Sequence, residues 1–183
     1  VFFLVLVLLF FNGCTHDLAL KNQDEKLISD DLCVTAGEVY YHFSRGVLFT
    51  LSGEFDKAAN EYKTVLTFDP VSSYVRIELA KLYIRQGEFI EAVAVLEKSL
   101  LYNPDHIDTH LILGSLYNKL NEQDNAVREY QKVIELNPQK QESYLFLSII
   151  YHERKNFEAS IQILKKLISL DPDNLMANYH LGK

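Results

Sequence analysis

The strongest candidates for metal chemistry are two histidines one helical turn apart. His106 and His110 are separated by four residues, and Asp105 and Asp108 lie beside them. Imidazole nitrogens and carboxylates at this spacing could hold a divalent cation on one face of a helix. However, Tyr144 stands 34 residues after His110, in the repeating pattern described below, so packing explains His110 better than ligation does. We therefore expect no metal site and no bound cofactor.

No residue pattern typical of an enzyme outweighs its structural explanation. His152 and Glu153 begin like the zinc-binding motif His-Glu-x-x-His, but Asn156 occupies the position of the second histidine. The sequence also lacks a glycine-rich phosphate loop and a nucleophile elbow of the type Gly-x-Ser-x-Gly. We therefore expect no catalytic residue and no small-molecule substrate.

Composition indicates a folded, acidic protein. Hydrophobic residues make up 48% of the sequence, which is ordinary for a globular protein. The 25 Asp and Glu residues outnumber the 18 Lys and Arg residues and give a net charge of −7. This charge repels the phosphates of nucleic acid, so we expect no nucleic-acid partner. The only cysteines, Cys14 and Cys33, signal neither a disulfide framework nor a zinc site.

The N-terminus has the features of an export signal. Residues 1–11 are apolar and uncharged, a run too short to span a bilayer but typical of the h-region of a signal peptide. Cys14 stands at the end of this run and precedes a polar stretch from Thr15 to Asp31. The four residues from Phe11 to Cys14 resemble the lipobox of bacterial lipoproteins, in which the cysteine is acylated and becomes the new N-terminus.

The lipobox resemblance implies a signal peptide over residues 1–13 and lipidation at Cys14. Residues 14–34 show no sustained period and are predicted to form a polar tether, with a weak helix around Leu27. Thr15 rather than Asp after the cysteine implies the outer membrane, so we expect a bacterial envelope lipoprotein that faces the periplasm. Two alternatives remain open, an ordinary secretory signal and an apolar leader that merely contains a cysteine. No basic residue precedes the apolar run and no Met opens the chain, so we expect this N-terminus to be truncated or misassigned.

The remaining sequence repeats every 34 residues. Every proline follows Asp or Asn in a turn-initiating dipeptide, and these prolines are Pro70, Pro104, Pro138 and Pro172. A column of small residues has the same spacing, at Gly46, Ala80, Gly114, Ser148 and Gly182. A second small column is formed by Ala58, Ala92, Ala126 and Ser160, and an aromatic column by Phe49, Tyr83, Tyr117 and Tyr151. Small residues at fixed positions indicate closely packed helices, and the recurring aromatics indicate core rather than an aromatic ligand box.

From about Val39 onward this pattern resembles the tetratricopeptide-repeat (TPR) family. The resemblance implies an all-α fold, a right-handed α-solenoid of helix-turn-helix repeats, over residues 35–183. The repeats are expected at about 39–72, 73–106, 107–140 and 141–174, with a partial fifth at 175–183. The departures are mild, because His42, Arg76, His110 and Tyr144 occupy the usual tryptophan site. The chain stops inside the fifth repeat, so we expect it to be a fragment.

The period also predicts the helix boundaries. First helices are expected at roughly 36–52, 73–86, 107–120 and 141–154, and second helices at roughly 55–68, 89–102, 123–136 and 157–170. A capping box at Thr35–Glu38 predicts that the first helix starts there, because Thr35 can accept from the backbone while Glu38 reaches back.

In the TPR family the first helices line a groove that binds protein or peptide partners. By resemblance the groove residues here are Tyr40, Phe43, Val47, Tyr74, Ile77, Lys81, Arg85, Leu111, Ser115, Asn118, Lys119, Leu145, Ile149, His152 and Tyr179. Their character is apolar with a basic centre at Lys81, Arg85 and Lys119, which favours an amphipathic helix or extended peptide that carries an acidic residue. The alternative is that Ile77, Leu111, Leu145 and Ile149 simply pack against one another, or that they bury the N-terminal segment or missing repeats.

Our leading hypothesis is therefore a non-catalytic scaffold, held in the envelope by a lipid anchor at Cys14, that binds a protein or peptide. Family analogy suggests a role in envelope assembly, and analogy alone supports it. Two other functions remain open, a docking or regulatory part of a longer enzyme and a cytoplasmic adaptor whose apolar N-terminus is an artefact of the start site.

Overall fold

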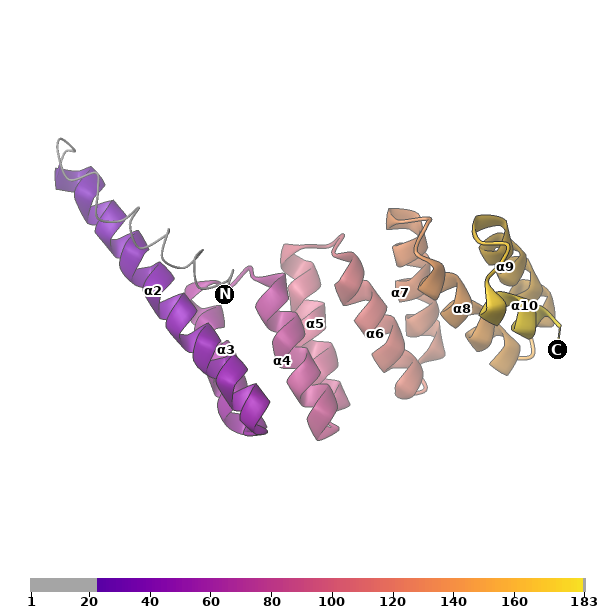
Figure 1. Cartoon of the computed structure of the whole chain (residues 1–183), viewed down its shortest axis with the longest axis horizontal. Coiled ribbons are helices and arrows are strands. Elements are labelled where there is room, and N and C mark those ends of the chain that lie inside the picture. Colours follow the sequence, from indigo (N-terminus) through magenta and orange to yellow (C-terminus); the bar gives the residue numbers. More distant parts are fainter. Residues whose placement is uncertain (1–22, 183) are drawn as a thin grey trace. The chain divides into compact units, whose positions relative to one another are not determined.

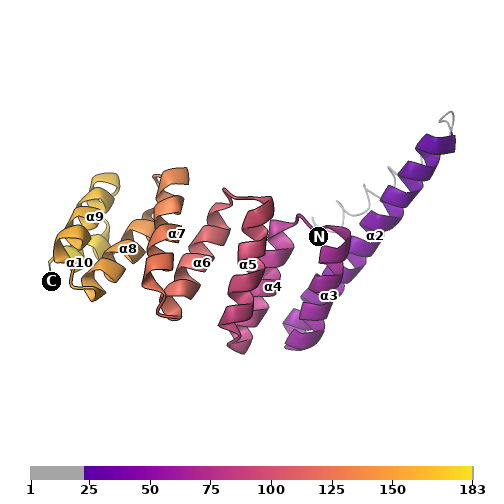
Figure 2. The same cartoon turned by 180° about the vertical axis from the view of Figure 1, so that it is seen from behind.

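The computed structural model describes residues 23–182, which form helices joined by short turns (Figures 1 and 2). The chain divides at Pro70 and Val71 into two compact units, and each is described by itself. The first unit holds α2 (Gln23–Ser52) and α3 (Phe55–Phe68). The second unit holds α4 (Ser73–Gln86), α5 (Phe89–Tyr102), α6 (Ile107–Lys119), α7 (Gln123–Leu136), α8 (Gln141–Glu153), α9 (Phe157–Leu170) and α10 (Leu175–Leu181). No strand occurs among residues 23–182, and the predicted all-α fold class is confirmed.

The helix boundaries confirm the 34-residue period. Each second helix, α3, α5, α7 or α9, is 14 residues long and begins 34 positions after the one before. The first helices α4, α6 and α8 keep the same spacing, beginning at Ser73, Ile107 and Gln141. Helices α6 and α8 end one residue earlier than predicted. Residues 23–182 therefore form helix-turn-helix repeats, as the sequence predicted.

The start predicted for the first helix is wrong. Helix α2 begins at Gln23, whereas the capping box at Thr35 predicted a start immediately after that residue. A Ser/Thr-x-x-Glu pattern marks a helix start only where the preceding residues cannot be helical. Neither proline nor glycine stands between Gln23 and Thr35, and Asp24 and Glu25 favour a helix N-terminus at this point. The helix therefore continues through the predicted cap.

The extension of α2 also changes the predicted tether. Residues 23–34, the second half of the stretch predicted as a polar tether, are helical (Figure 1). The predicted signal peptide and the lipidation site Cys14 lie outside the described residues. Among the helices of residues 23–182, none combines the length and the apolar character needed to cross a membrane.

The turn inside each repeat uses a left-handed backbone conformation at one fixed position. Gly53 and Gly87 adopt φ of 79° and 82° in the first two repeats. Asn121 and Lys155 occupy the same position in the next two repeats, with φ of 63° and 59°. Glycine adopts positive φ without steric cost and asparagine tolerates it, whereas a lysine side chain is strained there. The fourth repeat therefore carries the least favourable of the four turns.

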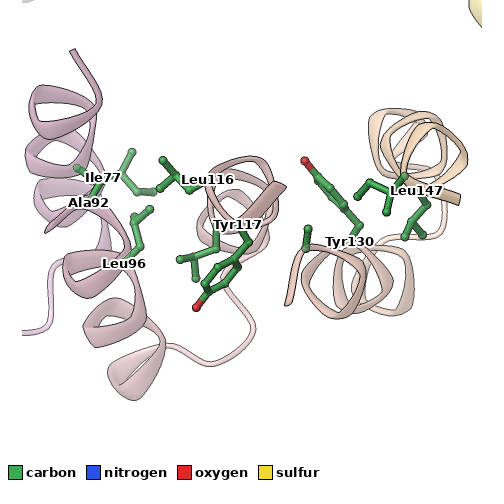
Figure 3. Packing of buried hydrophobic residues seen from close by; sticks show 11 residues of the cluster. Ile77, Ala92, Leu96, Leu116, Tyr117, Tyr130 and Leu147 are labelled. Carbon is green, nitrogen blue, oxygen red and sulfur yellow. The ribbon is translucent and has the colours of Figure 1, made fainter. Parts of the chain in front are cut away.

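The core of the second unit extends from α4 to α8 (Figure 3). Figure 3 shows Ile77, Ala92, Leu96 and Leu116 facing one another, and the Tyr130 ring beside Leu147. Three members of the two predicted small columns, Ala80, Ala92 and Ala126, lie inside this core and have no exposed surface, whereas Gly182 is exposed. A further cluster around Tyr144, Leu164, Leu167 and Ala177 continues the packing to α10. The small residues let adjacent helices approach closely, which is the reason for their recurrence.

The residue type in the first small column depends on the size of the side chain that it faces on the following helix. A Cβ atom placed on Gly114 would lie 2.8 Å from the ring of Tyr130, and one on Gly46 would lie 2.5 Å from the ring of Tyr62. Ala80 stands at the glycine position of the second repeat, where the partner position holds Leu96 instead of tyrosine. Glycine is therefore required only where the neighbouring helix presents tyrosine.

Candidate protein-binding surface

A hydrogen bond fixes the start of three first helices to the turn before them. At the fourth helix position, His110 Nε2 lies 2.7 Å from Pro104 O. Tyr144 donates its hydroxyl to Pro138 O at 2.9 Å, and Asn178 donates its amide to Pro172 O at 3.1 Å. The partner is always the proline carbonyl six residues earlier. The column that usually holds tryptophan is thus filled by residues that can donate a side-chain hydrogen bond, as tryptophan can.

His110 is also linked to the second helix of its repeat. Its Nδ1 lies 2.6 Å from Glu129 Oε2. Since both ring nitrogens face oxygen acceptors, the doubly protonated imidazolium satisfies both contacts. Burial lowers the pKa of His110, but the hydrogen bonds to Glu129 and Pro104 raise it more, and the net pKa is above its usual value. His42 and Glu61 repeat the contact in the first unit, again at 2.6 Å and 19 residues apart.

The two histidines considered for a metal site have separate structural contacts. His106 Nδ1 accepts from the backbone N–H of Thr109 and caps α6, while His110 contacts Glu129 and Pro104. Within the described part of the chain, no group of three or more His, Cys, Asp or Glu side chains is placed to hold a metal ion. Capping and packing therefore account for both residues.

The predicted groove residues of the second unit differ in exposure. We call them the first-helix face, and they come from α4, α6, α8 and α10. The exposed members are Tyr74, Lys81, Arg85, Ser115, Lys119, His152 and Tyr179. The half-buried members are Leu111, Asn118, Leu145 and Ile149. The predicted residues Tyr40, Phe43 and Val47 lie on α2 in the first unit, where Tyr40 is exposed and the other two are half-buried.

Ile77 differs from the expectation of an open binding residue. Only 8% of it is exposed, and it belongs to the core that extends from α4 to α8. Figure 3 shows Ile77 beside Ala92 and Leu116. Ile77 is therefore covered by core packing, while Leu111, Leu145 and Ile149 keep partly exposed surfaces.

The basic centre of the first-helix face is partly neutralised. Lys81 Nζ donates to Glu78 Oε1 at 2.7 Å, three residues earlier on α4. Lys119 Nζ lies 4.6 Å from the ring centroid of Phe89, at the start of α5. A cation over an aromatic ring is attracted by the negative face of that ring, which holds the lysine near the repeat boundary. The Glu78 contact was missed, although an acidic residue three positions before a lysine is a recognisable helix pair.

Two tyrosines expose the largest aromatic surfaces on this face. Tyr74 is 61% exposed on α4, and Tyr179 is 57% exposed on α10. Phe146, which the sequence prediction omitted, is 40% exposed beside Leu145 and stacks on Tyr130 with ring centroids 5.2 Å apart. Tyrosine offers a rigid apolar ring and a hydrogen-bonding hydroxyl, a combination common in protein interfaces.

Comparisons with known proteins agree with this architecture. Two family models, both described as tetratricopeptide repeat, match the chain. One matches residues 49–116 and the other matches residues 107–140 and 141–174, so that together they extend over residues 49–174. The search of curated proteins gave no match.

Several solved structures have the same fold. The crystal structure of MamA protein has a TM-score of 0.72 and 26% identity, covering 80% of this chain and 80% of that chain. A tetratricopeptide repeat protein from Parabacteroides merdae has a TM-score of 0.74 at 20% identity, covering 79% of this chain and 57% of that chain. YrrB, described as a TPR protein with an unusual peptide-binding site, has a TM-score of 0.67 at 15% identity, covering 85% and 79%. The last two identities show likeness of fold alone.

Proposed function

We propose a function from the premise that this chain belongs to the tetratricopeptide-repeat family, whose models extend over residues 49–174. Proteins of this family bind protein or peptide partners, and this chain is accordingly a protein-interaction scaffold. Our finer proposal is that the first-helix face of the second unit receives a partner segment with apolar anchors, without catalysing a reaction. YrrB, which has a similar fold, is described as having a peptide-binding site.

One observation carries this proposal. The exposed rings of Tyr74 and Tyr179 belong to the same face as the partly exposed side chains of Leu111, Leu145 and Ile149. Partly buried apolar side chains offer contact area, and exposed tyrosines offer anchoring sites that lose little conformational entropy on binding. The Lys81–Glu78 pair lies on α4 beside them and can exchange its internal contact for one with a charged group of the partner. An amphipathic helix or an extended peptide would fit this chemistry.

We also propose that the scaffold is a lipoprotein of the bacterial envelope, anchored through Cys14 in the outer membrane and facing the periplasm. The order of the apolar run, Gly13, Cys14 and a following polar stretch supports the anchor. Thr15 supports the outer membrane by resemblance to the sorting pattern of such lipoproteins.

The binding surface can be tested by site-specific photocrosslinking. A photoreactive amino acid replaces Tyr74, Tyr179 or, as a control, the exposed Arg128 on the second helix α7 of the full chain. In cells, we expect the first two positions to capture the same envelope protein and the Arg128 position not to capture it. The variant Tyr74→Ala with Tyr179→Ala should bind the captured protein roughly tenfold more weakly.

The double variant should keep the melting temperature of the parent, because exposed substitutions away from special features have small effects on stability. Capture through Arg128 alone, or unchanged affinity of the folded double variant, would show that the partner binds elsewhere.

A further inference from the structure

Helix α5 exposes an apolar stripe. The four second helices have equal lengths and begin 34 residues apart, so their positions correspond one to one. At the second, sixth and thirteenth positions, α5 carries Ile90, Ala94 and Leu101. All three are exposed, Ile90 by 71% and Leu101 by 80%. At 100° per residue these positions lie within about 40° of one another, so they form a single line along the helix, on which the exposed Glu97 stands between Ala94 and Leu101.

The same three positions are polar in every other second helix. They hold Asp56, Asn60 and Thr67 in α3, Asp124, Arg128 and Glu135 in α7, and Glu158, Gln162 and Ser169 in α9. All nine of these residues are exposed. Because the positions face solvent in each of the four helices, the fold itself does not require apolar residues there. The three exposed apolar residues on α5 therefore indicate a contact outside the repeat, since exposed apolar surface with polar residues around it often marks an interaction site.

We propose that this stripe binds the same stripe of a second copy of the chain, with the two α5 helices antiparallel about a two-fold axis. An axis midway between Ala94 and Glu97 pairs Ile90 of each copy with Leu101 of the other. The same axis sets Ala94 opposite Glu97, whose carboxylate accepts the Tyr117 hydroxyl at 2.5 Å. The small alanine leaves room for that carboxylate, so the stripe is complementary to itself in this orientation.

The charges beside the stripe fit the antiparallel pairing. Glu91 and Lys98 are both exposed and lie on the same flank of α5, seven residues apart. The proposed two-fold axis places this flank of both copies on the same side of the helix pair. It brings Glu91 of one copy within about two residues, roughly 3 Å along the axis, of Lys98 of the other. Opposite charges thus meet twice, whereas a parallel pair would place the two charged flanks on opposite sides.

The contact should be weak. A single-helix stripe is smaller than the roughly 800 Å² per partner that is typical of stable interfaces. We therefore expect dimers to form when the chain is locally concentrated. This inference concerns the second helices and does not depend on the proposed binding function of the first-helix face.

Cysteine crosslinking tests the pairing directly. The full 183-residue chain, with Cys14→Ser and Cys33→Ser, carries a single new cysteine at Ala94→Cys and is treated in detergent with a short bifunctional maleimide. The proposed axis places the two residues 94 about three residues apart along the helix, within reach of the reagent. Matched controls are Asn60→Cys on α3 and Arg128→Cys on α7, at the same helix position. We expect covalent dimer from Ala94→Cys, increasing with protein concentration and roughly tenfold above either control.

Three further variants separate loss of pairing from loss of folding. Ile90→Asp with Leu101→Glu, added to Ala94→Cys, introduces residues that α7 carries at these positions, so the repeat should fold while the crosslink falls about tenfold. Glu91→Lys should weaken crosslinking, and Glu91→Lys with Lys98→Glu should restore it. Crosslinking of Ala94→Cys no higher than the controls would overturn the proposal. So would undiminished crosslinking in the Ile90→Asp and Leu101→Glu variant, or failure of the charge exchange to restore a weakened crosslink.

Discussion

His110 is a buried ionisable residue whose two ring nitrogens contact oxygen atoms on the turn before its helix and on the helix that follows it. Nε2 contacts the Pro104 carbonyl in the preceding turn, and Nδ1 contacts Glu129 on α7. The contact with Glu129 joins the two helices of the third repeat, and both contacts favour the protonated ring. His110 is therefore a residue through which pH changes the stability of the fold.

The pKa of His110 is raised in the folded state, so its stabilising contribution is complete below the unfolded value of 6.5 and is lost as pH rises through the folded value. We expect the free energy of unfolding to decrease from about pH 5.5 to about pH 8.5 by more in the parent than in His110→Tyr. Tyrosine is the residue of the fourth repeat and keeps a hydroxyl donor for Pro104 O. Urea denaturation at both pH values measures the difference, and equal pH dependence in the two proteins would contradict this role.

Gly114 is a residue-scale example of size matching. Gly114→Ala should destabilise the fold by about 1–3 kcal/mol, because its Cβ would meet the Tyr130 ring. Combining it with Tyr130→Leu reproduces the alanine and leucine pair of the second repeat. The double variant should lose at least about 1 kcal/mol less than the sum of the two single changes. Equilibrium urea unfolding of the four proteins gives this coupling, and additive losses would contradict the matching.

Gly37 provides a control for the Gly114 experiment. It lies within helix α2, and a Cβ atom placed on it meets no atom within 4 Å. Gly37→Ala should therefore stabilise the helix by about 0.5–1 kcal/mol, through helix propensity alone. Opposite signs at the two glycines would show that contact with Tyr130, rather than the loss of glycine as such, decides the effect.

At the scale of the element, the turns within the repeats differ in strain. Lys155→Gly should stabilise the protein by about 0.5–1 kcal/mol, because glycine adopts the observed φ of 59° without a clash of its Cβ. Gly87→Ala, at the same position of the second repeat, should destabilise it by about 1 kcal/mol. Thermal unfolding monitored by circular dichroism measures both. A destabilised Lys155→Gly variant would mean that the lysine side chain makes a contact that outweighs the strain.

The sequence predicted seven helices nearly to the residue, because one register fixed by the prolines applies to every repeat. Helices α5 and α9, for example, have the predicted bounds. The start of α2 was predicted from Thr35 and Glu38 alone, and a local capping pattern cannot show that the preceding residues are also helical. Repetition therefore constrained the internal helices more strongly than the first one.

The sequence predicted which residues belong to the candidate surface, but not which of them other side chains cover or contact. The resemblance to the family implied that Tyr74, Tyr179 and Lys119 belong to the first-helix face, and they are exposed. It could not show that Ile77 would be covered, because burial depends on how closely the neighbouring helices approach. The Lys81–Glu78 pair and the apolar stripe on α5 consist of residue types that do not recur from repeat to repeat. The prediction relied on columns that do recur, so it did not identify them.

At the scale of the whole molecule, membrane attachment would come from the lipid anchor that we propose. In a bacterium that processes lipoproteins, we expect Cys14 to incorporate labelled fatty acid and Cys14→Ser to lose both the label and membrane association. Several acyl chains give a stability of anchoring that one chain does not. Cys33→Ser is the matched control and should keep the label. Label retained by Cys14→Ser would contradict lipidation at this residue.

The length of α2 also determines the direction in which its N-terminal end points. Its first 12 residues, from Gln23 to Val34, precede the predicted cap and extend about 18 Å at 1.5 Å per residue. A flexible peptide of the same length would have nearly the same average reach, roughly 19 Å, but would sample every orientation. The helix therefore adds little reach and instead aligns its N-terminal end with the axis of the first repeat. A group joined to that end would be presented from one side, as if on a short rod.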